Sequence, residues 1–207
     1  MAKAARKKKV ADASAEEKII QAARVVFTRN GYAATTVRDI AAEADINFSL
    51  VNYYFRSKEK LFDIIMKEGI QQLLSGMRKH LNDEHTTPEQ KIDIVCVELL
   101  DMLMGHPDLP LFVMNGVANS SPDIGKELVE NNVMLHSYFV KQLQERRAQG
   151  KLDIEPLHLV MNMMSMLILP FVARHLLIRS GAVDMQMFKA MMEDRKKKVA
   201  IWIKAMM

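Results

Sequence analysis

The sequence predicts an all-α protein of about nine helices, in which a small N-terminal domain precedes a larger helical body. Three observations lead to this fold class. Strand signals are nearly absent, because the 207 residues hold no alternating Val/Ile/Thr run and no Asn-Gly hairpin turn. Helix-capping patterns recur, and so do apolar residues at three- and four-residue spacing. Helices are predicted at residues 15–30, 37–44, 48–54, 58–82, 88–105, 108–118, 122–149, 156–179 and 184–205.

Capping residues and prolines mark where several of these helices begin. Ser14 to Glu17 and Thr87 to Gln90 fit the capping box, in which two side chains satisfy each other's backbone N–H groups. Ser121-Pro122 and Glu155-Pro156 place proline at the favoured first helical position. Glycines stand where three helices should end, at Gly31, Gly150 and Gly181.

Net positive charge is confined to the first third of the chain. Residues 1–68 carry 13 Lys and Arg against 9 Asp and Glu, whereas residues 69–207 carry 16 of each. A basic head on a neutral body favours a polyanion as partner of the head. We expect residues 1–14 to be a disordered basic arm, which either reaches the minor groove or phosphates of DNA or serves only as a solubilising tail.

Residues 36–55 have the layout of a helix-turn-helix, two short helices joined by a tight turn. Thr36 caps the first helix, with Asp39 at its third position. Asp45 tolerates the left-handed backbone that the turn requires, and Asn47 caps the second helix.

On a helical wheel, the second of these helices separates into a buried face and an outward face. Val51 and Phe55 should anchor it to the core. Phe48 is expected to pack inward as well, with contact to a thymine methyl group as the alternative. Tyr54 should pack its ring and offer its hydroxyl, and both Tyr54 and Leu50 lie at the borders between the two faces. The residues expected to face outward are Ser49, Asn52 and Tyr53.

The body is expected to bury most of its apolar surface. The helix over residues 88–105 has one apolar face, and the chain's one cysteine, Cys96, lies on it. We therefore expect a packed thiol rather than an exposed redox sensor. A single cysteine allows no intrachain disulfide and fits a reducing compartment, and no secretory signal is evident, so we expect a cytoplasmic protein.

Residues 157–178 form the most apolar stretch of the chain. Their length suits a membrane span, but His158, Asn162 and Arg174 would be costly in lipid, so we expect a buried helix or a subunit interface. Fourteen of the 17 methionines lie beyond residue 100. Methionine is flexible, which suits an adaptable interface or an apolar pocket as well as ordinary core packing.

Three motifs in residues 18–66 resemble one known family. They are Ile-x-x-Ala-Ala-x-x-x-Phe followed by Asn-Gly-Tyr, then Thr-Thr-Val-x-x-Ile-Ala, then Tyr-Phe-x-Ser-Lys-Glu-x-Leu. Together they are similar to the N-terminal domain of the tetracycline repressor (TetR) family of transcription regulators. The resemblance implies a helix-turn-helix DNA-binding domain over residues 15–66. It also implies an effector-binding and dimerisation domain over residues 67–207.

The family's DNA contacts transfer onto positions of this motif. The resemblance implies that Lys58, at the start of a helix, holds a phosphate together with Thr36, Tyr53 and Tyr54. Arg38 is expected to reach either the backbone or a base, and Leu50 borders this surface. The base-side positions are expected to be Asn47, Phe48, Ser49 and Asn52.

Two residues depart from the family's usual pattern. Asp45 replaces the usual glycine of the turn and brings a negative charge close to the DNA. Asn52 replaces a frequent tyrosine, and an asparagine can form a bidentate pair with adenine. We therefore expect Asn52 to read a base.

The resemblance further implies a repressor that forms a homodimer through its last two helices. It would bind palindromic double-stranded DNA and be released by a small apolar effector. An activator or a nucleoid-bound factor that recruits a protein partner is the alternative. The effector pocket is expected among the fifth to eighth helices. Its candidate residues are Phe112, Met114, Asn115, His136, Phe139, Met163 and Met166.

Enzymatic chemistry finds no support in the sequence. The chain has no Gly-rich phosphate loop, no nucleophile elbow and no partnered pair of carboxylates. Its six histidines are scattered and its cysteine is alone, which disfavours a metal site. We expect no catalysis, no cofactor, no metal and no membrane insertion.

Overall fold

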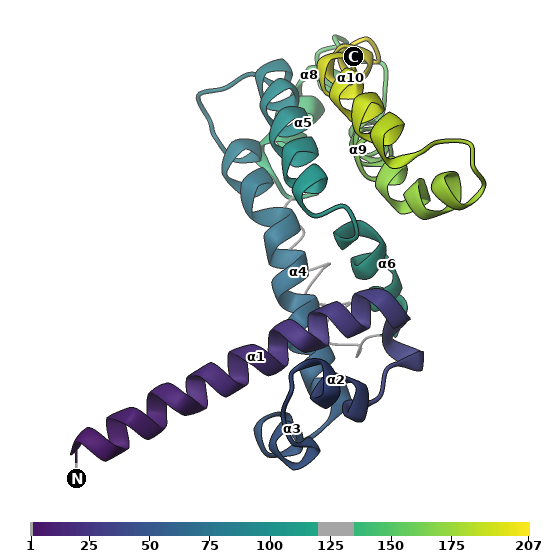
Figure 1. Ribbon diagram of the computed structural model, residues 1–207. Coiled ribbons are helices and arrows are strands. Elements are labelled where there is room, and N and C mark those ends of the chain that lie inside the picture. Colours follow the sequence, from purple (N-terminus) through teal and green to yellow (C-terminus); the bar gives the residue numbers. More distant parts are fainter. Residues whose placement is uncertain (1, 120–134) are drawn as a thin grey trace. The chain divides into compact units, whose positions relative to one another are not determined.

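The computed structural model describes residues 2–119 and 135–207, with side chains for residues 14–117 and from residue 135 onward. Within these ranges the chain forms nine helices and no strand, as Figure 1 shows, so the all-α expectation is confirmed. The start expected at residue 122 lies outside the described residues.

The described residues fall into two compact units. The first unit holds the residues up to Gly69 and those from Phe112 to the end of α6 (Leu109–Asn119). The second holds Ile70–Leu111 and the residues from Leu135 to Met207. The division therefore falls inside α4 (Lys58–Leu81), as the absence of a flexible linker suggests.

The first unit contains α1 (Ala2–Ala34), α2 (Val37–Glu43), α3 (Phe48–Phe55), the start of α4 and most of α6. Aromatic rings meet in its core. The Phe62 ring makes edge contacts with Phe27, at 5.0 Å between centroids, and with Phe112, at 5.9 Å. Buried residues from four helices surround these rings, among them Ile19, Val26, Ile40, Val51, Phe55, Leu61 and Ile65.

The helix α1 differs most from its prediction. It begins at Ala2 rather than at residue 15, so the arm that we expected to be disordered continues the helix. Ser14 consequently lies inside α1 and is no cap. The residues before it are mainly Ala, Lys and Arg with no proline or glycine, and such residues favour helix. Gly31 interrupts the helical backbone at φ 76° and ψ 168°, close to the predicted end.

The second unit is built around α5 (Pro88–Gly105), which packs against α8 (Tyr138–Ala148), α9 (Pro156–Arg179) and α10 (Met185–Lys204). The predicted bounds of α5 and α9 are confirmed. Thr87 and Gln90 form the predicted capping box, and Pro156 opens α9, although Glu155 makes no side-chain cap. Gly150 and Gly181 end their helices with positive φ. Burial raises the pKa of the Cys96 thiol to about 12, which confirms a packed thiol.

A buried lysine holds the loop between α4 and α5. The Lys91 side chain is inaccessible to solvent, and its Nζ donates to the carbonyls of Asp83 and Thr86, at 2.6 Å each. A third bond, of 2.8 Å, goes to the Thr86 hydroxyl, so all three ammonium donors are used. Gln142 of α8 donates to the same Thr86 carbonyl. Burial lowers the pKa of Lys91. Sequence reasoning missed this role, because nothing in the local pattern marks a lysine that will be buried.

The helices α9 and α10 each expose an apolar face that the described chain leaves uncovered. Among the described helices, α9 alone is long and apolar enough to cross a membrane by length and composition. Its opposite face packs into the core of the second unit. On α9 the exposed side chains recur on one side of the helix, at Leu157, Met161, Leu169 and Leu176. On α10 they are Met187, Met191, Ile201 and Trp202.

We predict that Lys91→Met lowers the free energy of unfolding by about 2 kcal/mol, because it removes three hydrogen bonds that hold the loop. Urea unfolding at a fixed protein concentration measures this change. Lys141→Met is the matched control, since Lys141 also lies over the Tyr138 ring but is exposed. Equal stability of the two variants would show that Lys91 does not hold the loop.

Candidate nucleic-acid interface

Local hydrogen bonds cap the N-termini of both α2 and α3, the two helices on either side of the turn. The backbone N–H of Asp39 donates to Thr36 Oγ1 at 3.2 Å, and the N–H of Thr36 donates to Asp39 Oδ2 at 2.8 Å. Hydrogen bonds from Thr36 hold the pKa of Asp39 below its usual value. Asp45 adopts φ 52°, as expected, and Asn47 Oδ1 accepts from the N–H of Ser49 at 2.8 Å. These bonds confirm the predicted caps and fix the short helices at their N-termini.

The helix α3 divides into the two faces that the wheel predicts. Val51 and Phe55 are buried, whereas the Tyr53 side chain is 76% exposed. Tyr54 is half-buried, and its ring meets the Tyr53 ring edge-on at 5.3 Å between centroids. The remaining outward positions are exposed or half-buried, namely Asn47, Ser49, Leu50 and Asn52. The outward face therefore presents amide, hydroxyl and phenol groups, which can meet base edges and phosphates.

Phe48 departs from its expected position. It is 42% exposed, so the expected inward packing is wrong. Phe48 opens α3 one turn ahead of Val51, and the guanidinium of Arg38 lies 5.9 Å from the centre of its ring. A cation over an aromatic face is stabilised by the charge distribution of the ring. Phe48 therefore pairs with Arg38 of α2 on the outer surface.

Lys58 has a structural role that the sequence did not reveal. Its Nζ donates to the carbonyls of Tyr32 and Thr35, at 3.0 Å each, and lies 4.2 Å from the Tyr32 ring centre. The Tyr32 hydroxyl donates to Glu59 at 2.9 Å. Burial, helped by Glu59, raises the pKa of Tyr32 to about 12. An ammonium has three donors, and these two hydrogen bonds use two of them. Tyr32 and Lys58 lie 26 residues apart, so no short sequence motif predicts their contact.

The seven residues expected to form an effector pocket are divided between the two units. Phe112, Met114 and Asn115 belong to the first unit, and the other four belong to the second. None of the seven lines the cavity between α4 and α5 or the cavity between α5, α9 and α10. Their exposure is mixed: Phe112, Phe139 and Met163 are buried, Met166 is half-buried, and Met114, Asn115 and His136 are exposed.

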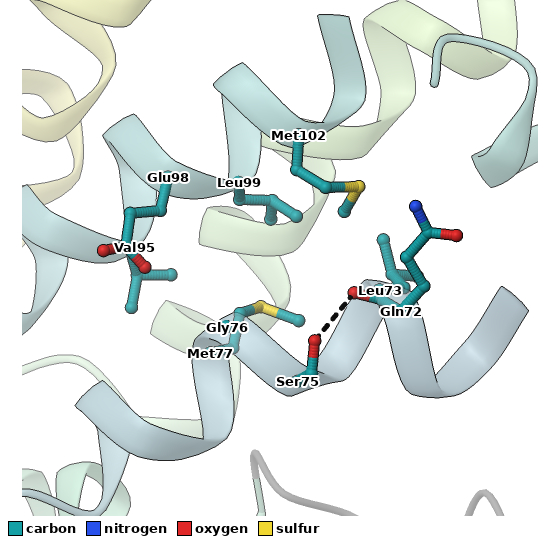
Figure 2. Close-up of a pocket in the computed structure, with 9 residues that line it drawn as sticks. All are labelled: Gln72, Leu73, Ser75, Gly76, Met77, Val95, Glu98, Leu99 and Met102. Atoms are coloured by element: carbon teal, nitrogen blue, oxygen red, sulfur yellow. Dashed lines mark hydrogen bonds between the residues drawn. The ribbon is translucent and has the colours of Figure 1, made fainter. Parts of the chain in front are cut away.

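A cavity of about 290 Å³ lies instead between α4 and α5, within the second unit (Figure 2). Its apolar wall consists of Leu73, Met77, Val95, Leu99 and Met102. Polar groups line the remainder, at Gln72, Ser75, Gly76 and Glu98. The Glu98 carboxylate also lies 2.9 Å from the His80 ring nitrogen. An apolar cavity with a few polar groups is the usual form of a small-molecule site.

No group of three or more His, Cys, Asp or Glu side chains that could hold a metal ion occurs in the part of the chain that the structure describes.

The N-terminal residues match a model of bacterial regulatory proteins, tetR family, over residues 19–65. The probable HTH-type transcriptional regulator YttP of Bacillus subtilis is 29% identical over 163 residues, which are 76% of this chain and 77% of that protein. The HTH-type transcriptional repressor KstR2 of Mycolicibacterium smegmatis is 32% identical over 80 residues, or 39% of this chain and 38% of that one.

The solved structure of FadR from Bacillus subtilis in complex with stearoyl-CoA has the same fold. It matches with a TM-score of 0.64 over 92% of this chain and 98% of that one, at 18% identity. The helix-turn-helix geometry and the family model agree over residues 19–65, so this domain belongs to the TetR family of bacterial regulatory proteins, and the chain is similar over most of its length to a transcriptional regulator.

Proposed function

We propose that the protein is a dimeric, cytoplasmic repressor that binds a palindromic operator and is released from it by a small apolar molecule. The observation that carries this proposal is the outward face of α3, where capped backbone and buried anchors hold polar side chains toward solvent. Residues 15–66 serve as the DNA-binding domain, and residues 67–207 serve effector binding and dimerisation.

Contacts to DNA are divided between phosphates and bases. Tyr53 and Tyr54 offer phenol hydroxyls, Thr36 offers its hydroxyl, and Lys58 offers its remaining N–H to phosphates. The half-buried Asn52 is held by α3 at a fixed position, which suits a bidentate pair with adenine. Arg38 is steadied by the Phe48 ring and reaches either a phosphate or a base. The base pairs next to the one that Asn52 contacts face the part of the surface formed by Asn47, Ser49 and Leu50.

Dimerisation through α9 and α10 would cover their exposed apolar faces. Leu169 is 59% exposed and Leu176 is 72% exposed, although both are large and apolar. A contiguous apolar face on a soluble protein marks an interaction surface, and a two-fold axis buries such a face against its own copy. A two-fold dimer also places two reading helices one DNA turn apart, about 34–36 Å.

The effector site is the cavity between α4 and α5. The same helix α4 begins at Lys58, in the DNA-binding unit, and contributes Leu73 and Met77 to the cavity wall. A ligand that separates α4 from α5 therefore acts on a helix that also carries a DNA contact. The FadR structure, which holds stearoyl-CoA, supports a ligand with a large apolar part.

We predict that Asn52→Ala removes discrimination at one base pair in each half-site. The loss should be about 1–3 kcal/mol, because an amide–adenine pair contributes that much against a wrong base. Operators are selected from random duplex DNA, and the affinity of each single-base variant is then measured. Tyr53→Phe is the matched control, since losing a phosphate contact should weaken all sequences alike. If Asn52→Ala also weakened all sequences equally, Asn52 would not read a base.

We predict that the double substitution Leu169→Lys and Leu176→Lys converts the dimer to a monomer. Two charges would then have to be buried in the apolar interface, which costs several kcal/mol. Sedimentation velocity measures the change in mass. Val97→Lys serves as the control, because Val97 is an exposed apolar residue of α5 outside this face. A double variant that remains dimeric would place the interface elsewhere.

We predict that Gly76→Phe weakens operator binding by about tenfold in the absence of any ligand. A Cβ at Gly76 meets only the Glu98 carboxylate, at 3.7 Å, so the new ring can fill the cavity as an effector would. Gly105→Phe is the control, since a Cβ there has no neighbour within 4 Å and Gly105 does not line the cavity. Unchanged operator affinity in Gly76→Phe would separate this cavity from DNA binding.

A further inference from the structure

A second cavity, of about 220 Å³, lies in the second unit and shares no residue with the cavity between α4 and α5. Side chains from the end of α5, from α9 and from α10 enclose it. Its apolar lining consists of Met104, Pro107, Phe171, Met185, Phe188 and Met192. Three charged residues complete the lining, Arg174, Lys189 and Glu193.

Arg174 is the unusual member of this lining, because it is a charged residue that is only 6% exposed. Its Nη2 donates to the Asp108 carboxylate and lies 3.3 Å from the His175 ring nitrogen. Its Nη1 reaches only the weakly accepting sulfur of Met185, at 3.9 Å, among the described residues. Its Nε is buried and has no acceptor among them. Much of the hydrogen-bonding capacity of this guanidinium is therefore unused.

Buried donors of a charged group are normally satisfied, so an unsatisfied one calls for an explanation. Here the explanation lies next to the residue, since Arg174 lines an apolar cavity. A planar guanidinium binds carboxylates through charge-assisted hydrogen bonds. Lys189, exposed at the same cavity, adds a second donor.

We propose that this cavity binds a small molecule that has an apolar body and one carboxylate. The carboxylate accepts hydrogen bonds from Arg174 and Lys189, and the body packs among the methionines and phenylalanines. The surrounding charges limit the ligand to a single negative charge. Asp108, which pairs with Arg174, and Glu193 in the lining oppose the two positive charges, so a phosphate dianion would be repelled more strongly than a carboxylate with one negative charge.

The site is independent of the proposed dimer interface and of the proposed effector cavity. On α10, Met185, Lys189 and Glu193 recur every four residues and follow one edge of the helix. The exposed apolar residues Met187 and Ile201 lie toward the other side. A ligand can therefore occupy the site in a monomer or in a dimer, and with or without DNA.

The test uses the full chain without DNA, with octanoate as probe and octanamide as its uncharged match. Calorimetric titration should show octanoate binding at least about tenfold more tightly than octanamide, since only the carboxylate makes charge-assisted bonds. In protein labelled with [13C-methyl]methionine, octanoate should shift the resonances of Met185 and Met192. Absence of octanoate binding at about 1 mM would overturn the proposal. So would equal binding of the two probes, or shifts confined to Met77 and Met102 of the other cavity.

Variants localise the carboxylate and the body separately. Arg174→Gln should bring octanoate affinity closer to that of octanamide while leaving octanamide affinity unchanged, since Lys189 remains as the second donor. If this variant does not fold, Met185→Trp tests the site instead. The larger side chain should obstruct the cavity and reduce octanoate affinity about tenfold. Gln186→Trp is its control, as the neighbouring exposed residue that does not line the cavity. Wild-type octanoate affinity in Met185→Trp would overturn the site. If octanoate does not change the affinity of the protein for its operator, the proposal that octanoate binds this cavity is unaffected.

Discussion

The outward face of α3, which we propose contacts DNA, depends on how this helix of only eight residues is held in place. A helix this short is not stable alone in water, because nucleation is costly and few backbone bonds follow. Two contributions offset this cost. Val51 and Phe55 are buried in the core of the first unit, and the Asn47 side chain satisfies an N–H at the start of the helix. The same helical geometry turns Asn52 and Tyr53 outward. The buried residues that anchor α3 and the exposed residues proposed to contact DNA are therefore separated by the period of the helix.

The neighbouring contacts extend this rigidity to the rest of the surface. Lys58 ties the first turn of α4 to carbonyls at the end of α1, and its ammonium lies over the Tyr32 ring. A Cβ at Gly116 of α6 would be 2.0 Å from Met66 Sδ, so a side chain there would require the buried Met66 to move. DNA recognition of the kind proposed requires a surface that is preorganised in this way.

Two buried cations of the second unit, Lys91 and Arg174, differ in how far their hydrogen-bond donors are satisfied. Lys91 is buried and fully satisfied, so it serves to order the loop before α5. Glu89 pairs with Arg146 of α8, which lowers the pKa of Glu89 to about 2 and joins α5 to α8. Arg174 is buried and only partly satisfied. A buried cation whose hydrogen-bond donors are all satisfied indicates a structural role, whereas one with unsatisfied donors beside a cavity indicates a ligand site.

The sequence alone determined whatever depends on residues within a few positions of one another. Capping boxes, prolines and glycines placed α2, α5 and α9 closely, and helical period assigned Val51, Phe55 and Tyr53 to their faces, because backbone bonds and side-chain direction repeat locally. The tertiary structure decided what depends on distant residues. Phe48 contacts Arg38 instead of the core, Lys58 contacts Tyr32, and the expected pocket residues line neither the cavity between α4 and α5 nor the cavity beside Arg174. These outcomes depend on which surfaces come together in three dimensions, and a cavity is a space left by several helices that no single stretch of sequence encodes.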